Sequence, residues 1–165
     1  MVNVKRPDLS REELLVKMQG WCAADERCSA DVRRKLRELG AIQADSIFIV
    51  DKLICDNFID DARFASLYVR SKINSRHWGR RRIEAELRQR QIALPVIRDA
   101  LQEIDDDAYF ATLVKLAGQK ADQVDGNDFA GRRKVFRYLI QKGYEPQLIG
   151  KALNWSPDEI EFTNE

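Results

Sequence analysis

One eight-residue segment occurs twice in this chain, and the repeat restricts the fold more than any other feature of the sequence. Asp60–Leu67 reads Asp-Asp-Ala-Arg-Phe-Ala-Ser-Leu, and Asp106–Leu113 returns 46 residues later as Asp-Asp-Ala-Tyr-Phe-Ala-Thr-Leu. Each copy is followed by a basic segment and then by a short apolar segment. Self-similarity at a period of about 20–50 residues indicates a tandem array of small structural units.

The periodicity within each repeat is helical, so the predicted fold is all-α. Val32, Leu36 and Leu39 recur at i, i+4 and i+7, which is the spacing of one apolar helix face. A looser first copy precedes the two clear ones. We therefore predict an elongated, curved array of three tandem three-helix modules. The predicted boundaries are 1–11 for an N-terminal tail, 12–58, 59–105 and 106–154 for the first, second and third modules, and 155–165 for a C-terminal tail.

Residues at the expected helix ends agree with these modules. Asp60, Asp106 and Ser29 precede apolar stripes, where a side-chain oxygen can accept hydrogen bonds from the unpaired N–H groups of the first turn. Glycine follows two of the basic helices, where a left-handed residue is favoured, and proline begins two of the short ones. These residues are Gly40 and Gly143, and Pro95 and Pro146.

The apolar stripes also predict the core. We expect Phe136 and Tyr138 to pack inside the third module as well, whereas the place of Trp78 stays open. The core candidates from the stripes are Leu14, Leu15, Val32, Leu36, Leu39, Ile49, Leu53, Phe64, Leu67, Tyr68, Ile83, Leu87, Ile97, Leu101, Phe110, Leu113, Val135, Leu139, Ile149 and Leu153.

Charge is unevenly distributed along the chain, although the formal net charge is only +1. Residues 70–92 carry eight basic and two acidic side chains, whereas 1–69 and 93–165 are both net acidic. A second basic stretch, 129–143, contains no acidic residue. Such segregation creates local potentials that steer a charged partner, whatever the total charge.

The chain offers little of what catalysis or metal binding requires. The single histidine, His77, cannot complete a zinc site with cysteines at this spacing, and no phosphate-binding loop or nucleophile elbow is present. Aspartates recur at equivalent helix starts, which favours capping over a magnesium site. We expect no cofactor, no metal and no enzymatic activity. Three cysteines without paired spacing, and a start without an apolar signal region, favour the cytoplasm.

Three segments resemble the RecX family of bacterial recombination regulators. The central one is 58–72, Phe-Ile-Asp-Asp-Ala-Arg-Phe-Ala-Ser-Leu-Tyr-Val-Arg-Ser-Lys; the second is 79–92, and the third is 137–144 together with 149–153. The resemblance covers about residues 12–154. Arg80 stands where the family often has proline, and we expect this extra arginine to affect how the middle module meets its partner.

The resemblance implies a non-enzymatic modulator of RecA, the recombinase that polymerises on single-stranded DNA. RecX-like proteins lie in the groove of the RecA–ssDNA filament and limit its growth, ATP hydrolysis, strand exchange and the co-protease activity of the SOS response. We expect a monomer that binds RecA filaments, binds DNA weakly by itself and binds no membrane. By charge placement, the predicted contact residues are Arg70, Lys72, Arg76, Arg80, Arg81, Arg82, Arg88, Arg90, Arg132, Arg133, Arg137 and Lys142.

Two other functions are weighed against this one. The basic segment 70–92 is also compatible with a helical protein that acts directly on nucleic acid, although the flanking acidic segments would repel a long polyanion. An enzyme built on the aspartate clusters around Asp60 and Asp106 is the least favoured alternative.

Overall fold

The computed structural model describes residues 9–124 and 129–155, which form nine α-helices, one short π-helical turn and no strands. Most of both predicted tails lies outside these residues. The predicted all-α array of three-helix modules is confirmed. The helices are α1 (Arg11–Ala24), α2 (Ser29–Glu38), α3 (Gln43–Cys55), α4 (Asp61–Ser71), α5 (Arg80–Gln89), α6 (Leu94–Gln102), α7 (Asp106–Val124), α8 (Phe129–Lys142) and α9 (Pro146–Leu153), with the π-helical turn η1 (Lys72–Arg76) continuing α4.

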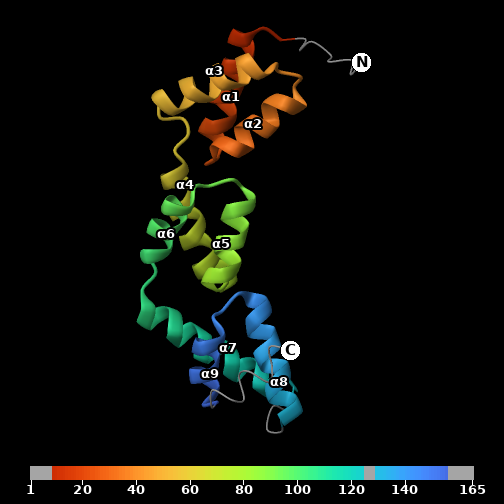
Figure 1. The fold of residues 1–165 in the computed structure, drawn as a ribbon, viewed down its shortest axis with the longest axis vertical. Coiled ribbons are helices and arrows are strands. Elements are labelled where there is room, and N and C mark those ends of the chain that lie inside the picture. Colours follow the sequence, from red (N-terminus) through yellow and green to blue (C-terminus); the bar gives the residue numbers. More distant parts are fainter. Residues whose placement is uncertain (1–8, 125–128, 156–165) are drawn as a thin grey trace.

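The helices form groups that follow one another along the long axis of the molecule (Figure 1), and three hydrophobic cores lie within them. The first is closed by α1, α2 and α3, the second by α4, α5 and α6, and the third by α7, α8 and α9. Cys28, which precedes α2, packs into the second core instead of the first. Each module thus buries its own apolar faces, and the three-helix unit is the repeating element of the fold.

Most of the predicted core is buried, with one clear exception. Leu67 is 46% exposed, because it lies on the outer face of α4 while Phe64 and Ala65 take the inner positions. Thirteen of the twenty candidates are buried, and six are partly buried at the edges of the cores. The six are Leu15, Leu39, Tyr68, Leu101, Phe110 and Leu153. Phe136 is fully buried as predicted, whereas Tyr138 is only half-buried.

Two of the three predicted helix caps are wrong in an informative way. Asp60 caps α4 as expected, since its Oδ1 accepts from the backbone N–H groups of Ala62 and Arg63. At α7, however, the carboxylate that accepts is Asp105, because Asp106 already belongs to the helix. At α2 the side chain of Ser29 is a donor, and it serves a contact with the next module.

Polar groups also join the first and second modules. The Asp61 carboxylate accepts from the backbone N–H and the hydroxyl of Ser29, both at 2.7 Å. Arg63 Nε donates to Glu26 at 2.9 Å across the same junction. A residue of α4 therefore caps the start of α2, which is why the α2 cap could not be found from local sequence.

Backbone atoms form part of the contact between the second and third modules. The N–H of Gly79 donates to the carbonyl of Lys142 at 2.8 Å, and the N–H of Arg81 donates to the carbonyl of Gly143 at 3.1 Å. A Cβ atom on Gly79 would lie 2.1 Å from the carbonyl carbon of Gly143. Gly143 itself has φ +93°, the left-handed conformation predicted after a basic helix. Only glycine permits this close approach of the two backbone segments.

Candidate partner-binding surface

Six side chains of the middle module form one continuous arrangement of aromatic rings and cations. One of its rings is Trp78, which is half-buried just before α5. The guanidinium carbon of Arg82 lies 4.0 Å from the centre of the Trp78 ring, and Nζ of Lys72 lies 5.3 Å from it. The indole thus holds two of the predicted contact residues next to one another through cation–π attraction.

The arrangement continues along α4. Nζ of Lys72 also lies 5.0 Å from the ring centre of Tyr68, which stacks on Phe64 with the ring centres 5.8 Å apart. The guanidinium carbon of Arg90 lies 5.5 Å from the centre of the Tyr68 ring and 5.6 Å from that of Phe64. Burial raises the pKa of Tyr68, which keeps the phenol neutral among these cations. We call Phe64, Arg90, Tyr68, Lys72, Trp78 and Arg82 the aromatic–cation row.

The row touches a neighbouring module at each end. Arg90 Nη1 donates to both carboxylate oxygens of Asp31, on α2, at 3.0 and 3.1 Å. Arg82 Nη1 donates to the carbonyl of Gln141, on α8, at 3.4 Å. The row therefore spans the middle module from one junction to the other.

Arg80 has a different environment from the other predicted contact residues. Its guanidinium forms an ion pair with Asp106, lies 3.6 Å from the Glu145 carboxylate and stacks 4.3 Å from the ring centre of Tyr109. The Tyr109 hydroxyl donates to Glu145 Oε2 at 2.8 Å and accepts from the N–H of Arg80 at 3.0 Å. The extra arginine of this chain thus ties the second module to the third.

Two more arginines of the middle module carry a carboxylate partner. Arg70 pairs with Glu103 at 3.2 Å, and Arg88 pairs with Glu84 at 2.5 Å. Hydrogen bonds from the Ser66 hydroxyl and then from Arg70 lower the pKa of Glu103. Both pairs are exposed, so solvent screens them and a competing anion can displace the carboxylate.

The predicted residues of α8 fall into two groups. Lys142 ends the helix at the junction, where its Nζ donates to the carbonyl of Arg76 at 3.1 Å. Arg132 packs at the other end, 5.2 Å from the ring centre of Trp155, and Arg133 is half-buried. At about 1.5 Å per residue the two ends are about 15 Å apart. Only Lys142 is shown beside the basic segment of the middle module.

Three of the predicted contact arginines are exposed and make neither an ion pair nor a cation–π contact among the described residues. They are Arg76 on η1, Arg81 on α5 and Arg137 on α8. Arg76 and Arg81 lie next to the junction of the second and third modules, where Gly79 and Arg81 donate backbone hydrogen bonds to Lys142 and Gly143, whereas Arg137 lies five residues before the end of α8. These guanidinium groups are available for bidentate contacts with carboxylates or phosphates.

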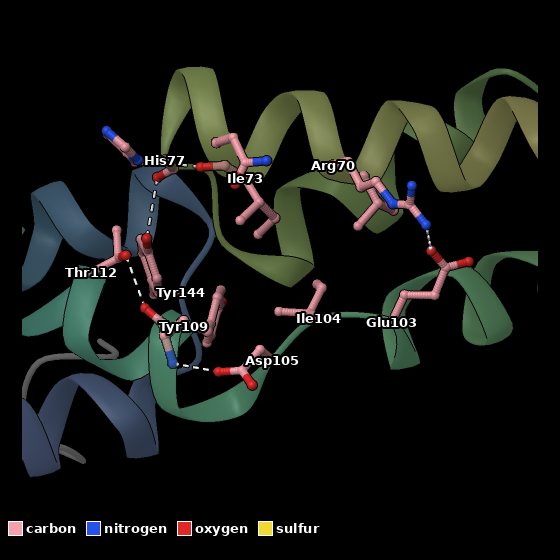
Figure 2. A pocket seen from close by; sticks show the side chains of 12 residues that line it. Arg70, Ile73, His77, Glu103, Ile104, Asp105, Tyr109, Thr112 and Tyr144 are labelled. Atoms are coloured by element: carbon pink, nitrogen blue, oxygen red, sulfur yellow. Dashed lines mark hydrogen bonds and ion pairs between the residues drawn. The ribbon is translucent and has the colours of Figure 1, made fainter.

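A pocket of about 340 Å³ lies beside this junction, on walls that both modules supply. Figure 2 shows the Arg70–Glu103 ion pair at one end and Tyr109, Tyr144 and His77 toward the other. The Tyr144 hydroxyl donates to the carbonyl of His77 at 3.3 Å, and burial raises the pKa of Tyr144 to about 12. Sequence reasoning missed the pocket, because its walls come from segments far apart in the chain.

Metal and membrane sites receive no support from the described helices. No group of three or more His, Cys, Asp or Glu side chains in residues 9–124 and 129–155 could hold a metal ion. Within the same residues, no helix combines the length and the apolar character that a bilayer crossing requires. The surface described above is therefore the strongest candidate site in this part of the chain.

Comparison with known proteins agrees with the repeat. The second three-helix domain of RecX matches residues 60–101, and the third matches residues 107–153. A regulatory protein RecX from Vibrio parahaemolyticus is 31% identical over 130 residues, covering 78% of this chain and 82% of the relative. One from Prosthecochloris aestuarii is 26% identical over 149 residues, covering 89% and 95%.

Solved structures show the same architecture. A crystal structure of regulatory protein RecX superposes with a TM-score of 0.81 at 25% identity, covering 87% of this chain and 71% of that one. RecX from Lactobacillus salivarius has the same fold, with a TM-score of 0.80 at 23% identity over 92% of this chain and 97% of that one. Both the repeat and the sequence matches lead to one conclusion. The chain belongs to the RecX family, whose members are regulatory proteins and not enzymes.

Proposed function

We propose that this protein binds the RecA–ssDNA filament in its groove, as a cytoplasmic monomer without a cofactor, and mainly inhibits RecA. Binding there limits filament growth, ATP hydrolysis, strand exchange and SOS co-protease activity. Family membership supports RecA as the partner. The chain's own contribution is an elongated body that presents cations along its middle module (Figure 1).

The observation that carries the proposal is the set of exposed arginines on η1, α5 and α8, the three elements whose ends meet at the junction of the second and third modules. Arg76, Arg81 and Arg137 make no ion pair among the described residues, so a partner's anionic groups meet no internal competitor. Arg80 and Arg90 are engaged within the chain, and we assign them to positioning the modules. Several modest contacts made by one chain bind a polymer tightly, because each contact raises the effective concentration of the next.

The test is a RecA ATPase assay on single-stranded DNA, titrated with this protein. We expect turnover to fall as the protein is added and to reach a low plateau when the groove is filled. An unchanged turnover at saturating protein would contradict the proposal. Bovine serum albumin at the same concentration controls for non-specific effects of added protein.

Direct action on nucleic acid is the second candidate, since the same exposed arginines can contact phosphates. If about five phosphates are neutralised on duplex DNA, the logarithm of the association constant falls with the logarithm of salt concentration at a slope of about −4.5. Tight binding to naked DNA with such a slope, together with an unchanged RecA ATPase, would favour this alternative.

A further inference from the structure

A second cluster of arginines lies at the junction of the first and second modules, outside the pocket and the exposed group described above. Arg33, Arg34 and Arg37 come from α2, and Arg90 follows α5. Together they line a cleft of about 320 Å³ that also contains Asp31 and Glu86. The sequence contains only one hint of it, because arginines at i and i+4 share a helix face.

Two of these four arginines are already paired with a carboxylate of the protein. The Asp31 carboxylate accepts from Arg34 at 2.8 Å and from Arg90 at 3.0 and 3.1 Å. Asp31 is only 4% exposed, so its charge is compensated inside the protein by these two guanidinium groups. The cleft thus contains a completed site in which two arginines hold one carboxylate.

The other two arginines have no such partner. Arg33 and Arg37 are exposed, one turn apart on α2, and make no ion pair among the described residues. Arg33 Nη1 donates only to the neutral hydroxyl of Ser29, at 3.1 Å. Two uncompensated guanidinium groups therefore face solvent beside the completed pair.

We propose that this cleft binds carboxylate side chains of an acidic peptide segment in a protein partner. Arg33 and Arg37 donate hydrogen bonds to an incoming carboxylate, in the way that Arg34 and Arg90 donate to Asp31. The side-chain amide of the neighbouring Gln89 forms a hydrogen bond with the peptide backbone. The cleft, with Asp31 and Glu86 among its lining residues, favours isolated carboxylates over a nucleic-acid strand. Such a strand would bring a dense row of negative charge against them.

The site depends on the junction between modules, because its arginines come from both sides of it. The Ser29–Asp61 and Arg63–Glu26 contacts hold α2 against the second module. Arg90 belongs both to the cleft and to the aromatic–cation row, so the occupant lies next to the end of the row. The proposal concerns the chemistry of a second site and stands independently of whether RecA is the partner.

The test uses the full chain and a short fluorescein-labelled peptide that alternates glutamate with glycine. Fluorescence anisotropy at low salt measures its dissociation constant, because such ion pairs are screened at higher ionic strength. We expect the double variant Arg33→Gln/Arg37→Gln to weaken binding about tenfold or more, since both charge-assisted contacts are lost. Arg98→Gln removes one exposed arginine on α6, outside the cleft, and we expect it to bind the peptide within about twofold of the wild type.

Three controls make the outcome decisive. The same peptide with glutamine in place of glutamate must bind much more weakly, and thermal melts must show that the double variant is folded. Equal affinity for the two peptides would overturn the proposal. So would an equal loss of affinity for the glutamate peptide in the double variant and in Arg98→Gln. So would a single-stranded oligonucleotide that binds more tightly than the glutamate peptide and depends on Arg33 and Arg37.

Discussion

Replacing Gly79 by alanine tests how the second and third modules are joined. The new Cβ would lie 2.1 Å from the carbonyl carbon and oxygen of Gly143 and 2.3 Å from the backbone nitrogen of Tyr144. All three are backbone atoms, so the segments must separate. Gly79 has φ −77° and ψ 160°, which alanine adopts without strain, so the variant perturbs the contact and leaves the local conformation intact.

The expected loss follows from two effects. Forcing extra volume into a packed contact costs about 1–3 kcal/mol, and separation weakens the two backbone hydrogen bonds from Gly79 and Arg81, each worth about 1 kcal/mol. We therefore expect the free energy of unfolding to fall by about 3 kcal/mol. Urea denaturation followed by circular dichroism measures this change, and a second transition would report uncoupled modules.

Gly20→Ala is the matched control. No atom outside the neighbouring backbone of α1 lies within 4 Å of the position of its added Cβ. Alanine is more favourable than glycine in a helix interior by about 1 kcal/mol, so this variant should be slightly more stable than the wild type. Alanine is also a poorer helix cap than glycine at position 79. A loss below about 1 kcal/mol for Gly79→Ala would be explained by the cap alone and would refute the close-contact argument.

Three further predictions concern stability and thiol chemistry. Asp60→Ala should lower the free energy of unfolding by about 1 kcal/mol, because the α4 cap is lost. Asp61→Ala should lower it by about 2 kcal/mol, because the Ser29 N–H and hydroxyl at the junction lose their acceptor. Equal losses of free energy in urea denaturation would contradict this difference. Burial raises the pKa of Tyr144 from 10 to about 12. Its contribution to the free energy of unfolding is therefore complete below pH 10 and is lost as the pH rises through 12. Over this pH range the free energy of unfolding should fall by about 2–3 kcal/mol more for the wild type than for Tyr144→Phe. Equal falls in the two proteins would contradict this prediction. An aromatic disulfide reagent should label exposed Cys55 at once but Cys22 and Cys28 only on unfolding, because burial hinders access to both thiols and raises their pKa. Labelling of all three cysteines at the same rate in the folded protein, followed by mass spectrometry, would contradict this.

The repeat made the fold predictable from sequence, because every local preference within it pointed to helices. Apolar spacing located the three cores, and Gly143 and Pro146 marked the end of α8 and the start of α9 correctly. The cap at Ser29 was wrong for a physical reason. Its acceptor, Asp61, is 32 residues away, and propensity rules see only neighbouring positions.

The candidate surface was only partly predictable. Charge placement found the arginines but could not tell that Arg80 is held by Asp106 and Glu145 while Arg81 beside it is exposed. A side chain's availability depends on which module meets which, and that information lies in contacts between distant segments. The arginine cleft on α2 was missed for the same reason, since its fourth member, Arg90, comes from another module.

The most direct measurement of the central claim is RecA ATPase inhibition by a triple variant, Arg76→Gln/Arg81→Gln/Arg137→Gln. These arginines support no ion pair among the described residues, so the variant should melt like the wild type. We predict that the concentration giving half-maximal inhibition rises about tenfold or more, while Arg98→Gln inhibits as the wild type does. A folded triple variant that inhibits RecA with undiminished potency would contradict the claim that these exposed arginines belong to the contact surface.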